Sequence, residues 1–363
     1  MSDKDVIVED TAGQAKPVPN TLLFAASIGL IALTIYLLVV GQSILVPLVL
    51  AIFITYLLRA LAHGLERIQI GNWILPNNIA LAVSILILLL LIVILVQLVA
   101  GNINSIIDAA PAYQEKLQEL FSNLQRVVDK WLGTSLTIGS LRENIDVQAG
   151  ILRLAGALQS IASNTFQIFL YVAFLLLEAQ TFDLKIKAFA STPEREAAIK
   201  RTLNSIGINI EKYVCIKTAM SLIVAILSYC ILLVAEIDFA AFWALLIFIL
   251  NYIPYIGSVI AVAFPVVLSL LQFSSIILTA SVLIGLLGVQ ILVGNIVEPR
   301  ITGKSLNLSP VVIVLALSVW GSIWGVIGMI LSVPIMVIVM IVLSQFSKTR
   351  PIAVLMSQSG EIR

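Results

Sequence analysis

The chain has 363 residues, of which 60% are hydrophobic and 11% are charged, whereas soluble domains are typically about 45–50% apolar and about 25% charged. This composition excludes an ordinary soluble globular protein, and the net charge of +1 gives no reason to expect a nucleic-acid partner. Several uncharged runs reach the roughly 20 residues that a spanning helix needs and lack the polar alternation of barrel strands. We therefore expect an all-α polytopic membrane protein.

The amino-terminal region is predicted to hold a tail and three spans. Residues 1–20 are polar and lack the cleavage pattern of a signal peptide, so they are expected to form a disordered cytoplasmic tail. The basic loop with Arg59, His63 and Arg67 is placed in the cytoplasm by the positive-inside rule. Spans 1–3 then occupy residues 21–100, at Thr21–Val40, Ile44–Ala62 and Ile79–Ala100.

Residues 101–160 are too polar for lipid and are expected to form an extramembrane segment. Apolar residues recur there at spacings of three and four, which predicts an amphipathic helix of about five turns. Three surfaces are open to its apolar face: the membrane, the rest of its own subunit, or a neighbouring copy in a homo-oligomer. The stripe consists of Tyr113, Leu117, Leu120, Leu124, Val127 and Trp131.

The remainder of the chain is expected to contain a fourth span with a basic cytoplasmic loop (161–213), a transport core (214–347) and a cytoplasmic tail (348–363). Basic residues just after position 299 and near position 348 belong on the inside by the positive-inside rule. The apolar segments Phe239–Leu271 and Pro310–Leu343 must then each enter the membrane and return. We expect about five to six full spans and two re-entrant hairpins in the cell inner membrane. Both termini are expected in the cytoplasm.

Gly and Pro residues mark the breaks of both hairpins. The first turns at Asn251–Gly257 and the second near Trp320–Gly325, with Pro334 nine residues after Gly325. Non-helical backbone at membrane depth is tolerated only where it is buried in protein or lines a wet cavity. We therefore expect Gly325 and Pro334 to shape the second hairpin, and both hairpins to face the interior.

Polar side chains gather near the end of the Ile276–Val297 span and in the first hairpin. Gln290, Gly294 and Glu298 share one face of a helix. Glu298 and Arg300 form either part of a transport path or an interfacial cap, and Asn251 either contacts solute or caps a broken helix. The candidate solute or ion pathway consists of Asn251, Pro254, Gly257, Gln290, Asn295, Glu298 and Arg300.

Four segments carry a family resemblance: NYIPYIGS at 251–258, GNIVEPRITG at 294–303, LNLSP at 306–310 and GVIGMILSVP at 325–334. In combination they resemble the autoinducer-2 exporter family over nearly the whole chain beyond residue 20. The resemblance implies an inner-membrane protein that exports small solutes, with the quorum-sensing signal autoinducer-2 as the named substrate. Some relatives are linked instead to sodium–proton exchange.

The leading expectation is facilitated or secondary export of a small polar solute such as autoinducer-2, with the solute and the lipid bilayer as partners. A cation–proton antiporter with Na⁺ or H⁺ coupling is the alternative, and it requires a titrating carboxylate such as Glu298. A membrane scaffold is a third reading, in which the extramembrane helix matters and the hairpin residues do not. The sequence carries no nucleophile–base pair, metal cluster or P-loop, so we expect no enzyme activity and no cofactor.

Overall fold

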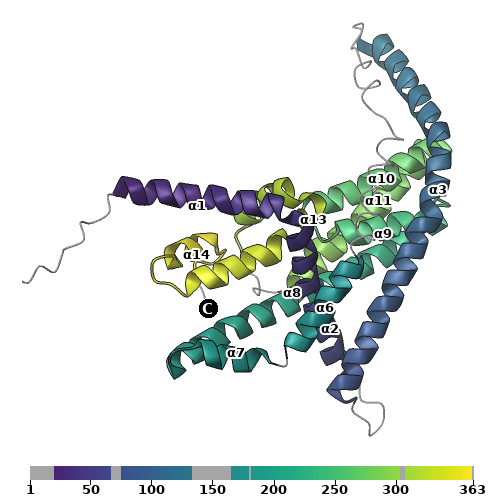
Figure 1. Ribbon diagram of the computed structural model, residues 1–363. Helices are drawn as coiled ribbons and strands as arrows, with labels where there is room; N and C mark the ends of the chain where they lie inside the picture. Colours follow the sequence, from purple (N-terminus) through teal and green to yellow (C-terminus); the bar gives the residue numbers. More distant parts are fainter. Residues whose placement is uncertain (1–19, 67–74, 133–164, 180, 303–306, 362–363) are drawn as a thin grey trace, which may run out of the picture. The chain divides into compact units, whose positions relative to one another are not determined.

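The computed structural model describes residues 20–66, 75–132, 165–179, 181–302 and 307–361 (Figure 1). Every regular element in these residues is a helix, and six helices are long and apolar enough to cross a membrane. The prediction of an all-α polytopic membrane protein is confirmed. Residues 1–45 and 46–363 form two compact units. The elements are α1 (Asn20–Val40), α2 (Gln42–Glu66), α3 (Asn77–Leu132), α6 (Thr165–Glu178), α7 (Phe182–Phe189), α8 (Pro193–Val234), α9 (Ala240–Leu250), α10 (Ile256–Phe273), α11 (Ile276–Gln290), η1 (Ile291–Val297), α12 (Glu298–Thr302), α13 (Pro310–Ser344) and α14 (Arg350–Met356).

The third predicted span and the amphipathic segment form one helix, α3, of 56 residues. Gly101 does not end it, because a single glycine in a helix costs only about 1 kcal/mol relative to alanine. Tyr113 is buried and Leu117 packs against the same apolar cluster, so this part of the stripe lies on the chain's own core. The side chains of Leu120, Leu124, Val127 and Trp131 lie outside the described residues, as do residues 133–164 and the predicted tail at 1–19.

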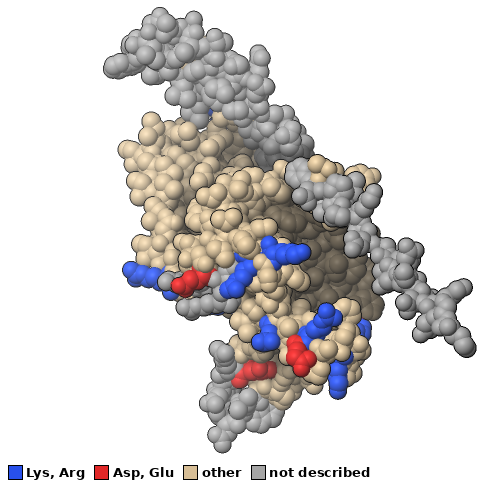
Figure 2. Space-filling model, turned by 90° about the vertical axis from the view of Figure 1, so that its left-hand side faces the viewer, with Lys and Arg blue, Asp and Glu red and all other residues tan. Residues whose placement is uncertain are grey.

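α8 joins the predicted cytoplasmic loop to the next span in one helix of 42 residues. It begins where Thr192 accepts a hydrogen bond from the Arg195 amide and Pro193 occupies the first turn, the arrangement that favours a helix start. The basic residues of α7 and of the amino-terminal part of α8 are exposed. Figure 2 shows Lys and Arg side chains gathered together on the face of the molecule that it displays.

The first hairpin, residues 239–273, consists of α9, a non-helical turn and α10. α9 has only 11 residues, about 17 Å at 1.5 Å per residue, which is roughly half of a hydrocarbon core about 30 Å thick. The turn brings Gly257 against the end of α9, where a Cβ atom would overlap the carbonyl oxygen of Leu250. Only glycine fits at this close approach.

Hydrogen bonds join the two open ends of the first hairpin. The Asp238 amide donates to Gln272 Oε1 at 3.0 Å, and Gln272 Nε2 donates to the Glu236 carbonyl at 2.9 Å. α3 reaches the same place: the Tyr113 hydroxyl donates to Asp238 Oδ2 at 2.6 Å, and Lys116 Nζ donates to the Gln272 carbonyl at 3.2 Å. The two ends therefore lie on the same side of the protein.

The second hairpin, residues 310–344, is α13, whose helical backbone breaks at Trp324 and Gly325. Gly325 has φ 61° and ψ −141°, a conformation that is essentially restricted to glycine. The close approach of Gly328 to Trp320 shows that the chain then folds back. A Cβ atom on Gly328 would overlap the Trp320 carbonyl oxygen, whereas residues eight apart in a straight helix are separated by about 12 Å. Gly328, not Gly325, thus occupies the position that Gly257 has in the first hairpin.

The open ends of the second hairpin are also tied together. The Ser309 amide donates to the Met356 carbonyl at 2.9 Å, and Leu308 forms an isolated antiparallel bridge with Ser357. Asn307 adds hydrogen bonds to the backbone of Ser359 and Glu361. The segment before α13 is therefore fixed to α14, which follows it.

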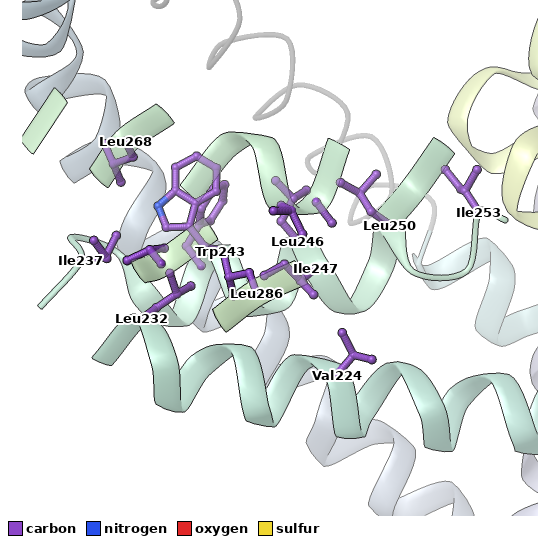
Figure 3. Packing of buried hydrophobic residues seen from close by; sticks show 14 of the residues in the cluster. Val224, Leu232, Ile237, Trp243, Leu246, Ile247, Leu250, Ile253, Leu268 and Leu286 are labelled. Carbon is purple, nitrogen blue, oxygen red and sulfur yellow. The ribbon is translucent and has the colours of Figure 1, made fainter. Parts of the chain in front are cut away.

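The largest apolar cluster packs the first hairpin against α8 and α11. Figure 3 shows Trp243 and Leu250 of α9 beside Val224 and Leu232 of α8, with Leu286 of α11 close to α9. These side chains are at least nine-tenths buried, and burying a large apolar side chain contributes about 1.5–3 kcal/mol. The cluster therefore holds the turn of the first hairpin next to the middle of α8.

Candidate functional site

An ion pair lies inside the helical core between α8 and the α11–η1–α12 helix. Lys217 Nζ is 2.8 Å from Glu298 Oε1 and 3.1 Å from Oε2, so the ammonium contacts both carboxylate oxygens. The Lys217 side chain is 9% exposed and that of Glu298 is 22% exposed. A charge within a membrane-spanning helix is costly and is retained chiefly where it has a function, which makes this pair the centre of the candidate site.

A cavity of about 350 Å³ borders the ion pair. This volume lies within the range of small-molecule sites. Its lining combines charged, amide and hydroxyl side chains with an apolar wall. The lining residues are Tyr213, Lys217, Asn251, Ile253, Pro254, Tyr255, Ser258, Val259, Leu287, Gln290, Ile291, Gly294, Asn295, Glu298, Ile313 and Val333.

Two polar stripes face each other across this cavity. Tyr213 and Lys217 lie at i and i+4 on α8, and residues at this spacing share a helix face. Gln290, Gly294 and Glu298 follow the same spacing on the opposite wall. The second stripe runs through η1, a π-helical segment of seven residues. π-helical turns are rare in proteins, and those that occur are often found at functional sites.

The turn of the first hairpin closes the cavity and is held by side-chain hydrogen bonds to α8. Asn251 Nδ2 donates to Ser221 Oγ at 2.9 Å, and both side chains are buried. The Tyr252 hydroxyl donates to Thr218 Oγ1 at 2.7 Å, and Thr218 in turn donates to the Val214 carbonyl at 2.7 Å. Asn251 thus fastens the turn to α8, and its side chain also lines the cavity.

Two buried polar groups of the cavity wall have no hydrogen-bond partner among the described residues: the Tyr213 hydroxyl and the Gln290 amide nitrogen. Tyr213 is 7% exposed and Gln290 is 8% exposed. A buried polar group without a partner costs about 1–3 kcal/mol. Such groups need a physical explanation in a well-packed protein.

The cavity extends from the middle of the spanning part of the protein toward the surface opposite Val234. Ser221, which holds the hairpin turn, is about 20 Å along α8 from Val234 at 1.5 Å per residue, in a hydrocarbon core about 30 Å thick. From the same end, the 11 residues of α9 carry the chain about 17 Å from Asp238 to the same turn. Both estimates place the hairpin turn that closes the cavity well inside the membrane, whereas Tyr213, about 32 Å along α8 from Val234, places the other end of the cavity near the opposite surface.

The structure brings most of the predicted pathway residues together. Asn251, Pro254, Gln290, Asn295 and Glu298 all line the one cavity. Gly257 and Arg300 do not line it: Gly257 sits inside the hairpin turn, and Arg300 is exposed on α12. Gly325 and Pro334 lie in the second hairpin but do not line the cavity, which Ile313 and Val333 of the same hairpin reach.

Sequence reasoning missed the α8 side of the site. Lys217 is a lysine inside an otherwise uncharged apolar run, and this alone marks it as a candidate. Its i, i+4 spacing from Tyr213 would have given the second stripe. In the structure Lys217 is the partner of Glu298.

Comparison with known proteins agrees with this architecture. A model of the AI-2E family transporters matches residues 27–348. The chain belongs to the AI-2E transporter family. It is 32% identical to the AI-2 transport protein TqsA of Escherichia coli K12, over 94% of this chain and 98% of that protein. It is 30% identical to a putative transport protein of Haemophilus influenzae, over 83% and 86% of the two chains, and 27% identical to the putative transport protein YhhT of E. coli K12, over 77% and 78%.

Family membership makes this chain a membrane transport protein, and its cavity combines polar and apolar lining residues. The AI-2E family match covers every residue that lines it.

Proposed function

We propose that this AI-2E transporter exports small, uncharged, polar solutes across the inner membrane, with autoinducer-2 or a similar metabolite as the leading candidate. The observation that carries the proposal is the deep polar cavity between α8, the first hairpin and η1. The name of the relative TqsA, an AI-2 transport protein, supports the choice of the first solute to test.

The charge balance of the cavity favours an uncharged solute. Lys217 and Glu298 neutralise each other at 2.8 Å, so neither an anion nor a cation finds an unpaired counter-charge there. A charged solute would have to break this pair and would lose its own hydration. Amides and hydroxyls remain to bind polar groups, and the apolar part of the wall fits a carbon skeleton.

The hairpins support a re-entrant arrangement. The ends of the first hairpin are hydrogen-bonded to each other at Asp238 and Gln272, which fits a segment that enters from one surface and returns to it. Residues 307–309, before the second hairpin, are hydrogen-bonded to residues at and just after the end of α14, which follows that hairpin. By the positive-inside rule, the first hairpin enters from outside and the second from the cytoplasm. Both then meet the cavity with broken or short helices, as in transporters built from discontinuous helices.

The ion pair would close the cytoplasmic end of the cavity. Glu298 lies two residues before Arg300, which the positive-inside rule places near the cytoplasmic surface. Lys217 joins this end of the helix to α8. Entry of a solute from the cytoplasm would therefore require α12 and α8 to separate, and the hairpin turn with Asn251 would form the barrier on the outer side.

Efflux from proteoliposomes tests the proposal. Autoinducer-2 is loaded inside, and its initial efflux is compared for wild type, Asn295→Leu and the control Asn204→Leu. Asn295 lines the cavity, whereas Asn204 is exposed on the amino-terminal part of α8. We expect Asn295→Leu to lower the rate at least several-fold and Asn204→Leu to leave it unchanged.

Gradients of Na⁺ and pH, applied in the same vesicles, separate the modes of transport. Efflux that does not depend on them indicates facilitated diffusion, and efflux that requires one indicates secondary transport. Proton movement on addition of Na⁺ without any solute flux would contradict the proposal and favour an antiporter.

A further inference from the structure

We infer that Tyr213 and Gln290 form the hydrogen-bonding subsite that recognises the solute, and that the solutes it takes are small uncharged compounds bearing several hydroxyl groups. This inference rests on the proposed function and deepens it. Its basis is the hydrogen-bond state of the buried polar residues in the cavity wall.

Four buried polar side chains line the cavity within the described residues: Tyr213, Lys217, Asn251 and Gln290. Lys217 is paired with Glu298, and Asn251 is bonded to Ser221. These two contacts hold the helices together and are complete without a solute. The Tyr213 hydroxyl and the Gln290 amide nitrogen have no partner in the part of the chain that the structure describes, so they are the buried groups that gain hydrogen bonds when a solute binds.

The position of the two residues fits joint recognition of one molecule. Tyr213 is on α8 and Gln290 ends α11, so they reach the cavity from two different helices. Both polar groups are at the terminus of a rotatable side chain. Both atoms are buried in the wall in this structure, so recognition requires the two side chains to move toward the cavity, where a solute with two oxygen atoms would bridge them.

The chemistry of the subsite defines the solute class. A phenolic hydroxyl both donates and accepts, and an amide presents two donors and one acceptor. A hydroxyl group complements both, because it also donates and accepts. The paired charges of Lys217 and Glu298 disfavour carboxylates, phosphates and amines. Small polyols and sugar-like compounds therefore fit better than organic acids, amino acids or nucleotides.

Apolar substitutions at such a subsite should preserve the stability of the protein and weaken its recognition of the solute. Replacement of an unpartnered buried polar group by an apolar group of the same shape removes its desolvation penalty. Tyr213→Phe and Gln290→Leu should therefore be at least as stable as wild type, while they lose one hydrogen bond to the solute. One such bond is worth about 0.5–1.5 kcal/mol, so a variant should discriminate about three- to tenfold less well against an analogue that lacks a hydroxyl.

The test measures initial efflux of ribose, of 2-deoxyribose and of autoinducer-2 from proteoliposomes with wild type, Tyr213→Phe, Gln290→Leu and the control Tyr56→Phe. Tyr56 packs in the same apolar cluster as Tyr213 but does not line the cavity. We expect wild type and Tyr56→Phe to prefer ribose over 2-deoxyribose. In the two cavity variants the preference should fall by about three- to tenfold, with melting temperatures that do not fall below that of wild type.

Two results would overturn the inference. The first leaves the proposed function intact, and the second contradicts it as well. A ribose preference that stays at the wild-type value in both cavity variants would remove Tyr213 and Gln290 as recognition residues and leave the proposed function intact. A folded wild-type protein that transports none of the three solutes would contradict the proposed function itself, and the inference with it.

Discussion

Removal of either partner of the Lys217–Glu298 pair should destabilise the protein far more than removal of both. Lys217 Nζ contacts both carboxylate oxygens, at 2.8 and 3.1 Å, and its side chain is 9% exposed. Loss of one partner leaves the other as an uncompensated buried charge, which costs about 3–5 kcal/mol, whereas replacing both with apolar residues is often neutral. Because Glu298 is the more exposed partner, Lys217→Met should cost about 3 kcal/mol and Glu298→Leu nearer 5 kcal/mol.

Thermal unfolding in detergent, followed by tryptophan fluorescence, measures this effect. At about 2 °C per kcal/mol for a large chain, the single variants should melt about 6 to 10 °C below wild type and the double variant close to it. Glu196→Gln, which breaks the exposed Glu196–Lys200 pair, is the control and should not shift the transition measurably. Single variants as stable as wild type, or a double variant with the sum of both losses, would refute the buried-pair argument.

Three further predictions follow from the hairpins and from α3. Gly257→Ala should destabilise the protein or abolish expression because its Cβ atom would overlap backbone, whereas Gly288→Ala, which meets open space, should be neutral or stabilising by up to about 1 kcal/mol; unfolding curves compare them. Single cysteines placed at Asp238 and at Gln272 should both be labelled from the same side of the membrane; labelling from opposite sides would disprove the re-entrant arrangement. Burial, and then its hydrogen bond to Asp238, raises the pKa of Tyr113 above the ordinary value near 10, so Tyr113→Phe should cost a constant stability from about pH 6 to 9. The neutral phenol is the stabilised form, so this contribution is complete below about pH 10 and is lost as the pH rises through the raised pKa; a cost that changes between pH 6 and 9 would contradict the assignment.

Much of this architecture could be predicted from local sequence. Long uncharged runs have few alternatives to spanning helices, and the Gly and Pro breaks placed both hairpin turns close to where they occur. The spacing of Gln290, Gly294 and Glu298 predicts one shared helix face, and all three residues line the cavity.

The sequence could not show which segments distant along the chain contact each other. The contact of Lys217 with Glu298 spans 81 positions, and local periodicity contains no information about it. The same holds for the approach of Gly328 to Trp320, because Gly325 and Gly328 are both within reach of the turn in sequence and only the backbone geometry distinguishes them. The continuity of α3 through Gly101 was missed because the change from apolar to polar residues occurs within a single helix.

The most direct test of the central claim, that solute passes through this cavity, is chemical modification of Ser258→Cys in a chain with Cys215 and Cys230 replaced by alanine. Ser258 lines the cavity, whereas the control Ser318→Cys places a thiol on the exposed surface of α13. Autoinducer-2 efflux is measured before and after complete reaction with a thiosulfonate reagent, with mass spectrometry as the check on modification. We predict that modified Ser258→Cys loses efflux, that the solute slows its modification, and that the modified control keeps transporting. Undiminished efflux through fully modified Ser258→Cys would contradict the claim.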